Sequence, residues 1–455
     1  MSNRFLLVAL SLSMKSSVIG VVSLPMQRIQ GGAPAIDRAQ TVRDLLAAAR
    51  GVPANICALA ANGASNWGGG WDAPSMSVRS DARSSLNESL RAPVPADERR
   101  ALVDGLASDD ACVRHLAGTL IGRSNDRAFV AEVAPRLESA NPVERAGAAR
   151  ALGLLGDRSA VDAIVRLLRD ATPDVRANAA WALGRIGDRR TATQVAPLVS
   201  DASDEVRLAA VTTLGHLEAA DNVELLLRVL KSDDNAEVRR TAAWALAEIG
   251  SRTAADGLAA ALHADKTDNV REMSAWALGE IHARDFADAL ANAAKSDQAP
   301  SVRETAAWSL GELGVKKSAD ALADVLTSDK DAHVRGTAAW AIGELNPGRA
   351  PKALVAALHD SDDDVRLKAA WALSEIGDSD AAPDIASAIK TERNDRVRVA
   401  LVRAVVESGE RSSDVFKDLL DSKDVETREM AVRALAGRRG PWPWPWPQPR
   451  PRPFP

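Results

Sequence analysis

The sequence has few aromatic residues and few cysteines, and neither sign of charge dominates it. Tyrosine is absent, and aromatic residues make up 4% of the 455 residues. Two cysteines, Cys57 and Cys112, exclude a disulfide-rich scaffold and any metal site with several cysteine ligands; one bridge or two buried thiols stay open. A net charge of −5 is too close to neutral to indicate a polyanion partner for the whole chain, so any basic patch must be local. Alanine is abundant, which favours helices packed closely on helices.

The first 35 residues resemble a secretory signal. Arg4 precedes an apolar run from Phe5 to Met14, and residues 33–35 are small enough for a cleavage site. Lys15 interrupts the pattern, so a membrane anchor and a cytoplasmic amphipathic segment stay open as alternatives. We expect residues 1–35 to be a signal peptide and the protein to be exported to the periplasm or outside the cell, with the cytoplasm as the alternative.

Two further regions do not repeat. Residues 36–95 include a glycine and tryptophan loop, 66–71, which lacks the spacings of phosphate-binding loops. Residues 438–455 form a tail in which proline alternates with tryptophan, arginine and phenylalanine and which contains no acid. Such a segment forms neither helix nor paired strand, so we expect polyproline II or disorder. The tail is a candidate for docking in the protein's own groove; contact with a membrane interface, or with nothing, is the alternative.

An arginine recurs between residues 96 and 437 at intervals of 30 to 32 residues, and this repeat predicts the fold. The recurring residues are Arg114, Arg145, Arg176, Arg207, Arg239, Arg271, Arg303, Arg335, Arg366, Arg398 and Arg428. Each interval accommodates two short helices with one apolar side each. A pair of that size cannot bury its apolar sides alone, so the copies must stack into a solenoid of about eleven repeats.

One repeat, residues 157–188, shows where its helices begin and end. Thr172 before Pro173 is a suitable N-cap followed by proline at the first helical position. Eleven residues after the recurring arginine, glycine is frequent, and glycine adopts the left-handed conformation that closes a helix. It stands at Gly156, Gly187, Gly250, Gly314, Gly377 and Gly409.

The segment 174–188, DVRANAAWALGRIGD, resembles the HEAT repeat of the phycobilin-lyase (PBS-lyase) type. The resemblance covers residues 96–437 and implies an all-α fold, an α-α superhelix whose second helices line the concave side. That family includes bilin lyase subunits, di-iron deoxyhypusine hydroxylases, DNA glycosylases and interaction scaffolds, so it implies the fold more strongly than the function.

Counted from the recurring arginine as position 0, positions 1, 5 and 9 form one stripe on the second helix. Position 5 is tryptophan at Trp181, Trp244, Trp276, Trp308, Trp340 and Trp371. Position 9 is glutamate in six consecutive repeats, at Glu248, Glu280, Glu312, Glu344, Glu375 and Glu407, and the first five of these also carry the tryptophan. The tryptophan points about 145° away from the apolar centre of its own helix. With the resemblance, this predicts a concave, ligand-binding surface of exposed indole rings and carboxylates.

An alternative for the tryptophans is that each ring lies flat against the neighbouring second helix and only widens the contact between repeats. For the recurring arginines we expect a structural role, an ion pair with an acid in an adjoining loop such as Asp174 or Glu205. Exposed pairs of that kind contribute about 0 to 1 kcal/mol each.

Motifs of catalysis and metal binding are missing. There is no His-Glu dipeptide of the kind with which the hydroxylases bind iron, and no serine elbow or Cys-x-x-Cys pair. Asp360, Asp362 and Asp364 begin like a calcium loop, but Val365 replaces the glycine that such a loop needs, so they fit a helix N-terminus better. We expect no catalytic residue, no metal and no cofactor. Glutamates in the groove would repel nucleic acid.

The sequence therefore predicts a non-catalytic protein-interaction scaffold that binds an extended, cationic or proline-containing polypeptide along a tryptophan- and glutamate-lined surface. We expect no stable membrane span. The alternative, taken from the resemblance, is an enzyme or accessory subunit of the bilin-lyase type.

Overall fold

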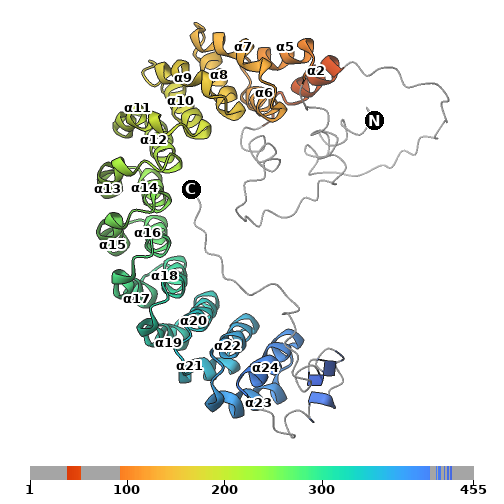
Figure 1. Cartoon of the computed structure of the whole chain (residues 1–455), viewed down its shortest axis with the longest axis vertical. Coiled ribbons are helices and arrows are strands. Elements are labelled where there is room, and N and C mark those ends of the chain that lie inside the picture. Colours follow the sequence, from red (N-terminus) through yellow and green to blue (C-terminus); the bar gives the residue numbers. More distant parts are fainter. Residues whose placement is uncertain are drawn as a thin grey trace, which may run out of the picture. The chain divides into compact units, whose positions relative to one another are not determined.

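The computed structural model describes residues 38–52 and 93–409, together with isolated positions between 417 and 432. Throughout these residues the regular elements are α-helices and 3-10 turns, arranged as an α-α superhelix (Figure 1). The chain divides into two units, residues 1–217 and 218–455. No helix in the described part of the chain is both long and apolar enough to cross a membrane.

In the first unit, α2 (Arg38–Ala48) packs against the first of a series of helical hairpins. The first helices of these hairpins are α5 (Ala96–Gly105), α7 (Ala128–Val133), α9 (Val161–Leu167) and α11 (Ala192–Val195), and the second helices are α6 (Ala111–Ser124), α8 (Pro142–Leu155), α10 (Pro173–Ile186) and α12 (Asp204–His216). Short 3-10 turns extend the first helices: η1 (Ala134–Glu138), η2 (Arg158–Ala160), η3 (Arg189–Thr191) and η4 (Ala196–Ser200).

The second unit continues the same pattern. Its first helices are α13 (Val223–Ser232), α15 (Ala255–Ala264), α17 (Ala287–Ser296), α19 (Ala319–Ser328), α21 (Lys352–Ala356) and α23 (Ala382–Thr391). Its second helices are α14 (Ala236–Ile249), α16 (Asp268–Glu280), α18 (Pro300–Leu313), α20 (Ala332–Leu345), α22 (Asp363–Ile376) and α24 (Asp395–Glu407). The 3-10 turns are η5 (Ala220–Asn222), η6 (Arg252–Ala254), η7 (Arg284–Phe286), η8 (Lys316–Ser318), η9 (Ala357–His359) and η10 (Ser379–Ala381).

Second helices of consecutive repeats pack more closely than first helices do. Small residues allow this approach: a Cβ atom added to Gly343 would lie 2.9 Å from the Cα of Ala372 on the next second helix. Figure 1 shows the consequence within the second unit, where α14 to α24 (even numbers) lie along the inner side of the curve and α13 to α23 (odd numbers) along the outer side. The second helices lie on the inner side because, in a curved array, the helices that pack more closely must follow the shorter arc.

The ends of the second helices follow the sequence pattern. All six glycines at position 11 adopt a positive φ, between 64° and 81°. Four repeats carry another residue there, and it adopts a positive φ as well: Asn125 (50°), Glu218 (49°), His282 (52°) and Asn346 (39°). The left-handed closing residue is thus confirmed and extends to repeats that lack glycine.

The N-caps follow the sequence in part. Asn141 caps α8 by accepting the N–H of Val143 over 3.0 Å. Thr172 occupies the N-cap position of α10, but its side chain makes no capping bond; instead the Asp170 carboxylate accepts the N–H of Thr172 over 2.9 Å. Asp170 thus binds the N-cap residue itself and not a backbone N–H of the first helical turn.

The expected signal peptide 1–35, the loop 66–71 and the tail 441–455 lie outside the described residues, so these expectations stay predictions. Export is checked by N-terminal sequencing of the mature protein. Cys112 is buried on α6 and is disulfide-bonded, while Cys57, the other cysteine of the chain, lies outside the described residues.

Candidate functional site

The recurring arginines form a ladder of ion pairs between consecutive repeats. In seven of them the guanidinium donates to a carboxylate 25 or 26 residues later, after the next first helix, and from Nη1 to a backbone oxygen six residues earlier. The pairs are Arg145–Asp170 and Arg176–Asp201 in the first unit, and Arg239–Asp265, Arg271–Asp297, Arg303–Asp329, Arg335–Asp360 and Arg366–Glu392 in the second.

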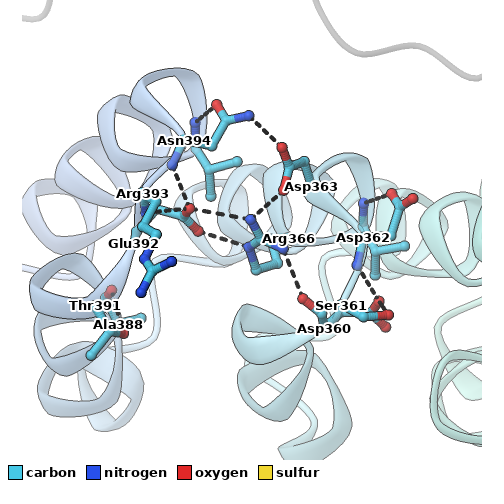
Figure 2. A network of polar contacts seen from close by, with 12 residues as sticks. Asp360, Ser361, Asp362, Asp363, Arg366, Ala388, Thr391, Glu392, Arg393 and Asn394 are labelled. Carbon is cyan, nitrogen blue, oxygen red and sulfur yellow. Dashed lines mark hydrogen bonds and ion pairs between the residues drawn. The ribbon is translucent and has the colours of Figure 1, made fainter.

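Figure 2 shows one rung of this ladder. Arg366 donates from Nε to Glu392 Oε2 over 2.7 Å and from Nη1 to the backbone oxygen of Asp360 over 2.8 Å, and it also pairs with Asp363. Glu392 Oε1 accepts the backbone N–H of Asn394, the N-cap of α24, over 2.7 Å. One carboxylate therefore links the preceding repeat to the start of the following helix.

The structural role expected for the arginines is confirmed, but Asp174 is not the acid that binds them. Its carboxylate accepts from Asn178 over 2.9 Å, whereas the ladder acids follow the first helices. The side chains of Arg303 and Asp329 are only 14% and 6% exposed, so these pairs are shielded from solvent. Removing one partner of a shielded pair costs more than breaking an exposed pair, because the remaining charge is left buried.

The six tryptophans are not exposed as the sequence predicted. Trp340 and Trp371 are 3% exposed, Trp244 5% and Trp276 8%, while Trp181 and Trp308 are half-buried. The prediction of a surface of exposed rings is therefore wrong, and the alternative of contact between repeats holds.

The preceding repeat provides the covering surface. A Cβ atom added to Gly343 would lie 2.6 Å from Trp371 Cζ3, and one added to Gly311 would lie 3.0 Å from Trp340 Cζ3. Each of these glycines stands at position 8 of the second helix before the tryptophan. A ring that points away from its own apolar side thus packs on the preceding second helix, and at Gly343 and Gly311 the absence of a Cβ atom leaves room for it.

The glutamates at position 9 are exposed on the inner row of the second unit. We call Glu248, Glu280, Glu312, Glu344 and Glu375 the glutamate row. They come from α14, α16, α18, α20 and α22, and all five are exposed as predicted. Their spacing along the row is the spacing of the packed second helices.

The glutamate row carries negative charge that is compensated only in part: burial raises the pKa of Glu312 and of Glu375, and the nearby charges of His282 and Arg403 oppose these shifts without cancelling them. Partial burial raises the pKa of Glu248, and the neighbouring charge of Glu280 raises it further. Partial burial also raises the pKa of Glu344, to which Glu312 and Glu375 add like-charge repulsion. In the described part of the chain, no ion pair reaches Glu248, Glu312, Glu344 or Glu375. The row is therefore an acidic edge that favours a cation.

The same stripe has the opposite sign in the first unit. Position 9 is Arg123 on α6, Arg185 on α10 and His216 on α12, and position 5 is Arg150 on α8. The sequence analysis did not single these out, although the repeat register that identified the glutamates also reads them directly. The reversal of charge between the units is the feature that sequence reasoning missed.

In the described residues, no three histidine, cysteine, aspartate or glutamate side chains could hold a metal ion together. Asp362 caps α22 by accepting the N–H groups of Asp364 and Val365. Asp360 is the ladder acid of Arg335. The three acids that begin like a calcium loop thus serve a helix N-terminus, as expected, and a repeat contact.

Comparison with known families supports the repeat assignment. A family model described as HEAT repeats matches residues 130–198, 193–279, 255–343 and 324–406. No curated protein sequence matches the chain.

Solved structures with the same fold are distant in sequence. Importin beta is 13% identical with a TM-score of 0.54, over 89% of this chain and 65% of that one. Kap95p, in a structure with RanGDP, is 14% identical with a TM-score of 0.53, over 88% and 61%. The chain thus spans less than two thirds of either protein, and the likeness shows the fold alone. The CpcE–CpcF complex of phycocyanin lyase from Nostoc is 20% identical over 54% of this chain and 94% of that one. Its TM-score of 0.31 is too low to indicate a shared overall fold.

Proposed function

Since the chain belongs to the HEAT repeat family, we propose that it is a non-catalytic scaffold that binds an extended, cationic polypeptide along the glutamate row of its second unit. The observation that supports this most directly is the row itself. Like charges are held next to one another on an exposed face, where their repulsion costs stability, and a basic partner would relieve that repulsion.

The spacing of the row suits a particular peptide conformation. Packed helices lie about 8–10 Å apart, so consecutive glutamates are separated by roughly that distance. A polyproline II helix advances about 9 Å per turn of three residues. A peptide with a basic residue at every third position would therefore present one cation to each glutamate, without the conformational cost that a flexible chain pays on binding.

The tryptophans have a different part in this proposal from the one the sequence suggested. Because the rings are buried between repeats, they fix the separation and orientation of the helices that carry the glutamates. Replacing Trp276, Trp308 and Trp340 together would remove packing and is not a clean test of binding. Only Trp308 and Trp181, which are half-buried, keep part of a ring for a ligand.

The test is fluorescence anisotropy with two labelled peptides of equal composition. The first is (Pro-Pro-Arg)5, and the second has its five arginines together before ten prolines. We expect the regularly spaced peptide to bind more tightly, and tighter binding of both at low salt. Equal affinities would contradict the spacing argument, and failure of both to bind would contradict the function.

The variant for this test is the triple substitution Glu312→Gln, Glu344→Gln and Glu375→Gln. It should weaken binding by between about threefold and 100-fold, because three exposed charge pairs contribute roughly 0.2–1 kcal/mol each. A matched control removes three exposed acids from the outer helices: Glu224→Gln, Asp256→Asn and Asp320→Asn. If both triple variants lose affinity equally, net charge is responsible and the glutamate row is not the site.

The chain's own tail has the chemistry of the proposed ligand. Residues 441–455 alternate proline with tryptophan, arginine and phenylalanine and carry Arg450 and Arg452. We propose it as an intramolecular competitor for the row. A chain that ends at residue 440 should then bind (Pro-Pro-Arg)5 more tightly than the full chain, and equal affinities would show that the tail binds elsewhere or not at all.

A further inference from the structure

A basic cluster lies in the first unit. It consists of His115 on α6, Arg150 on α8 and Trp181 on α10, three consecutive second helices. The Arg150 guanidinium carbon lies 4.6 Å from the centre of the Trp181 ring, in cation–π contact. We call these three residues the Arg150 cluster.

Arg150 has no counter-ion. Every ladder arginine from Arg239 to Arg366 donates to a carboxylate, whereas no hydrogen bond or ion pair joins Arg150 to any described residue. Its Nε atom and the Nε2 atom of His115 are both shielded from solvent without a hydrogen-bond partner in the described part of the chain. Two polar nitrogens on adjacent helices are thus left unsatisfied, which is costly unless a ligand compensates them.

The electrostatics agree with an uncompensated cation. Burial lowers the pKa of Arg150, and the negative charge of Asp174 opposes this shift only in part. Burial also lowers the pKa of His115, and the positive charge of Arg150 lowers it further. A negative group placed beside Arg150 would reverse both effects.

We propose that the Arg150 cluster binds a carboxylate of an acidic polypeptide segment. The planar guanidinium offers parallel N–H groups that match the two oxygens of a carboxylate, and the Trp181 ring covers one of its faces. His115 supplies a second nitrogen on the neighbouring helix. This inference goes beyond the proposed function because it assigns a second site, of opposite charge, in the other unit.

A carboxylate fits better than a nucleic acid. A polynucleotide carries one charge per nucleotide and is held by a series of uncompensated cations. In the first unit the other stripe arginines, Arg123 and Arg185, already engage in other interactions. One uncompensated guanidinium over one indole matches a single anionic group.

The test uses the full chain and labelled hexaglutamate, with hexaglutamine as the uncharged peptide and hexathymidylate as the phosphodiester probe. We expect hexaglutamate to bind in a salt-sensitive manner and the other two to bind at least about tenfold more weakly. Arg150→Gln should lower the affinity for hexaglutamate about tenfold or more. No binding of hexaglutamate to the unaltered protein, or tighter binding of hexathymidylate, would overturn the proposal.

A matched control distinguishes the site from net charge. Arg403 stands at position 5 of α24, the same place in the repeat as Arg150, and Arg403→Gln removes the same charge from the other unit. It should leave hexaglutamate binding unchanged, and equal loss in both variants would overturn the proposal. The His115 imidazole resonance provides a second readout: it should move on addition of hexaglutamate to the unaltered protein and stay in place in Arg150→Gln. Circular dichroism confirms that each variant keeps its helices.

Discussion

At the scale of single residues, the closing position of each second helix shows how backbone conformation limits side-chain choice. Ten described repeats place a residue with positive φ there, and six of them use glycine. A residue with a Cβ atom pays about 1–2 kcal/mol for this conformation. The four repeats with asparagine, glutamate or histidine therefore store strain that their glycine-containing neighbours avoid.

This strain predicts that His282→Gly stabilises the protein. Its φ of 52° is strained for histidine and free for glycine. The gain is offset by the greater freedom of glycine in the unfolded chain, so the expected rise in the free energy of unfolding is about 0.5–1 kcal/mol. Urea denaturation followed by circular dichroism measures it.

The matched control is Gly314→Ala at the same position of the following repeat. A Cβ atom added there meets no atom within 4 Å, so any loss of stability is due to the backbone alone. We expect a loss of about 1 kcal/mol. If His282→Gly destabilised the protein, the side chain of His282 would have to make a contact worth more than the strain it carries.

At the scale of helices, the contact between consecutive second helices depends on where glycine stands in each helix. Within α20, a Cβ atom added to Gly343 would lie 2.6 Å from Trp371 Cζ3 and 2.9 Å from the backbone of Ala372. One added to Gly336 would meet Lys368 Cδ at 3.2 Å, part of a long and flexible side chain. The two glycines of one helix therefore differ in how well they tolerate a methyl group.

Gly343→Ala is expected to destabilise the protein by about 1–3 kcal/mol, because a tryptophan and the neighbouring backbone must move apart. Gly336→Ala should be neutral or stabilising by up to about 1 kcal/mol, because alanine is the better helix former. Thermal and urea unfolding of the two variants measure the difference. Equal effects in both would mean that Trp371 does not define the separation of α20 and α22.

The same contact explains what could be predicted from the sequence and what could not. The repeat, its two helices and the closing glycine follow from local periodicity, because each depends on residues within one turn or one repeat. Trp371 points away from its own apolar side, which the helical geometry predicts. What covers it is Gly343, on the preceding repeat, and a single helix considered alone cannot show that neighbour.

The sequence likewise predicts one part of the candidate site and not the other. The exposure of the glutamate row was predicted because it follows from the position of each glutamate on its own helix. The ladder arginines were predicted to form ion pairs because a charge beside an apolar face requires a counter-ion. The partner itself, such as Asp329 for Arg303, follows the end of the next first helix and depends on how two hairpins stack.

At the scale of the whole molecule, two sets of carboxylates respond to acid in opposite ways. Hydrogen bonds from ladder arginines lower the pKa of Asp170, Asp201 and Asp360, so the stability they provide is present above their ordinary pKa and is lost as the pH falls through the lowered value. Burial and like charges raise the pKa of Glu344, so its ionisation costs stability, and that cost disappears as the pH falls through the raised value.

Acidification should therefore abolish the binding of a basic peptide before it unfolds the protein. Burial raises the pKa of Glu248, Glu312, Glu344 and Glu375 above the ordinary glutamate value, whereas hydrogen bonds from the arginines lower the pKa of the ladder aspartates below theirs. We expect the affinity for (Pro-Pro-Arg)5 to fall over a pH interval in which circular dichroism does not change. The triple variant Glu312→Gln, Glu344→Gln and Glu375→Gln, already weak, should lack this pH dependence. Loss of binding only together with loss of helicity would contradict this prediction, because unfolding alone would then account for it.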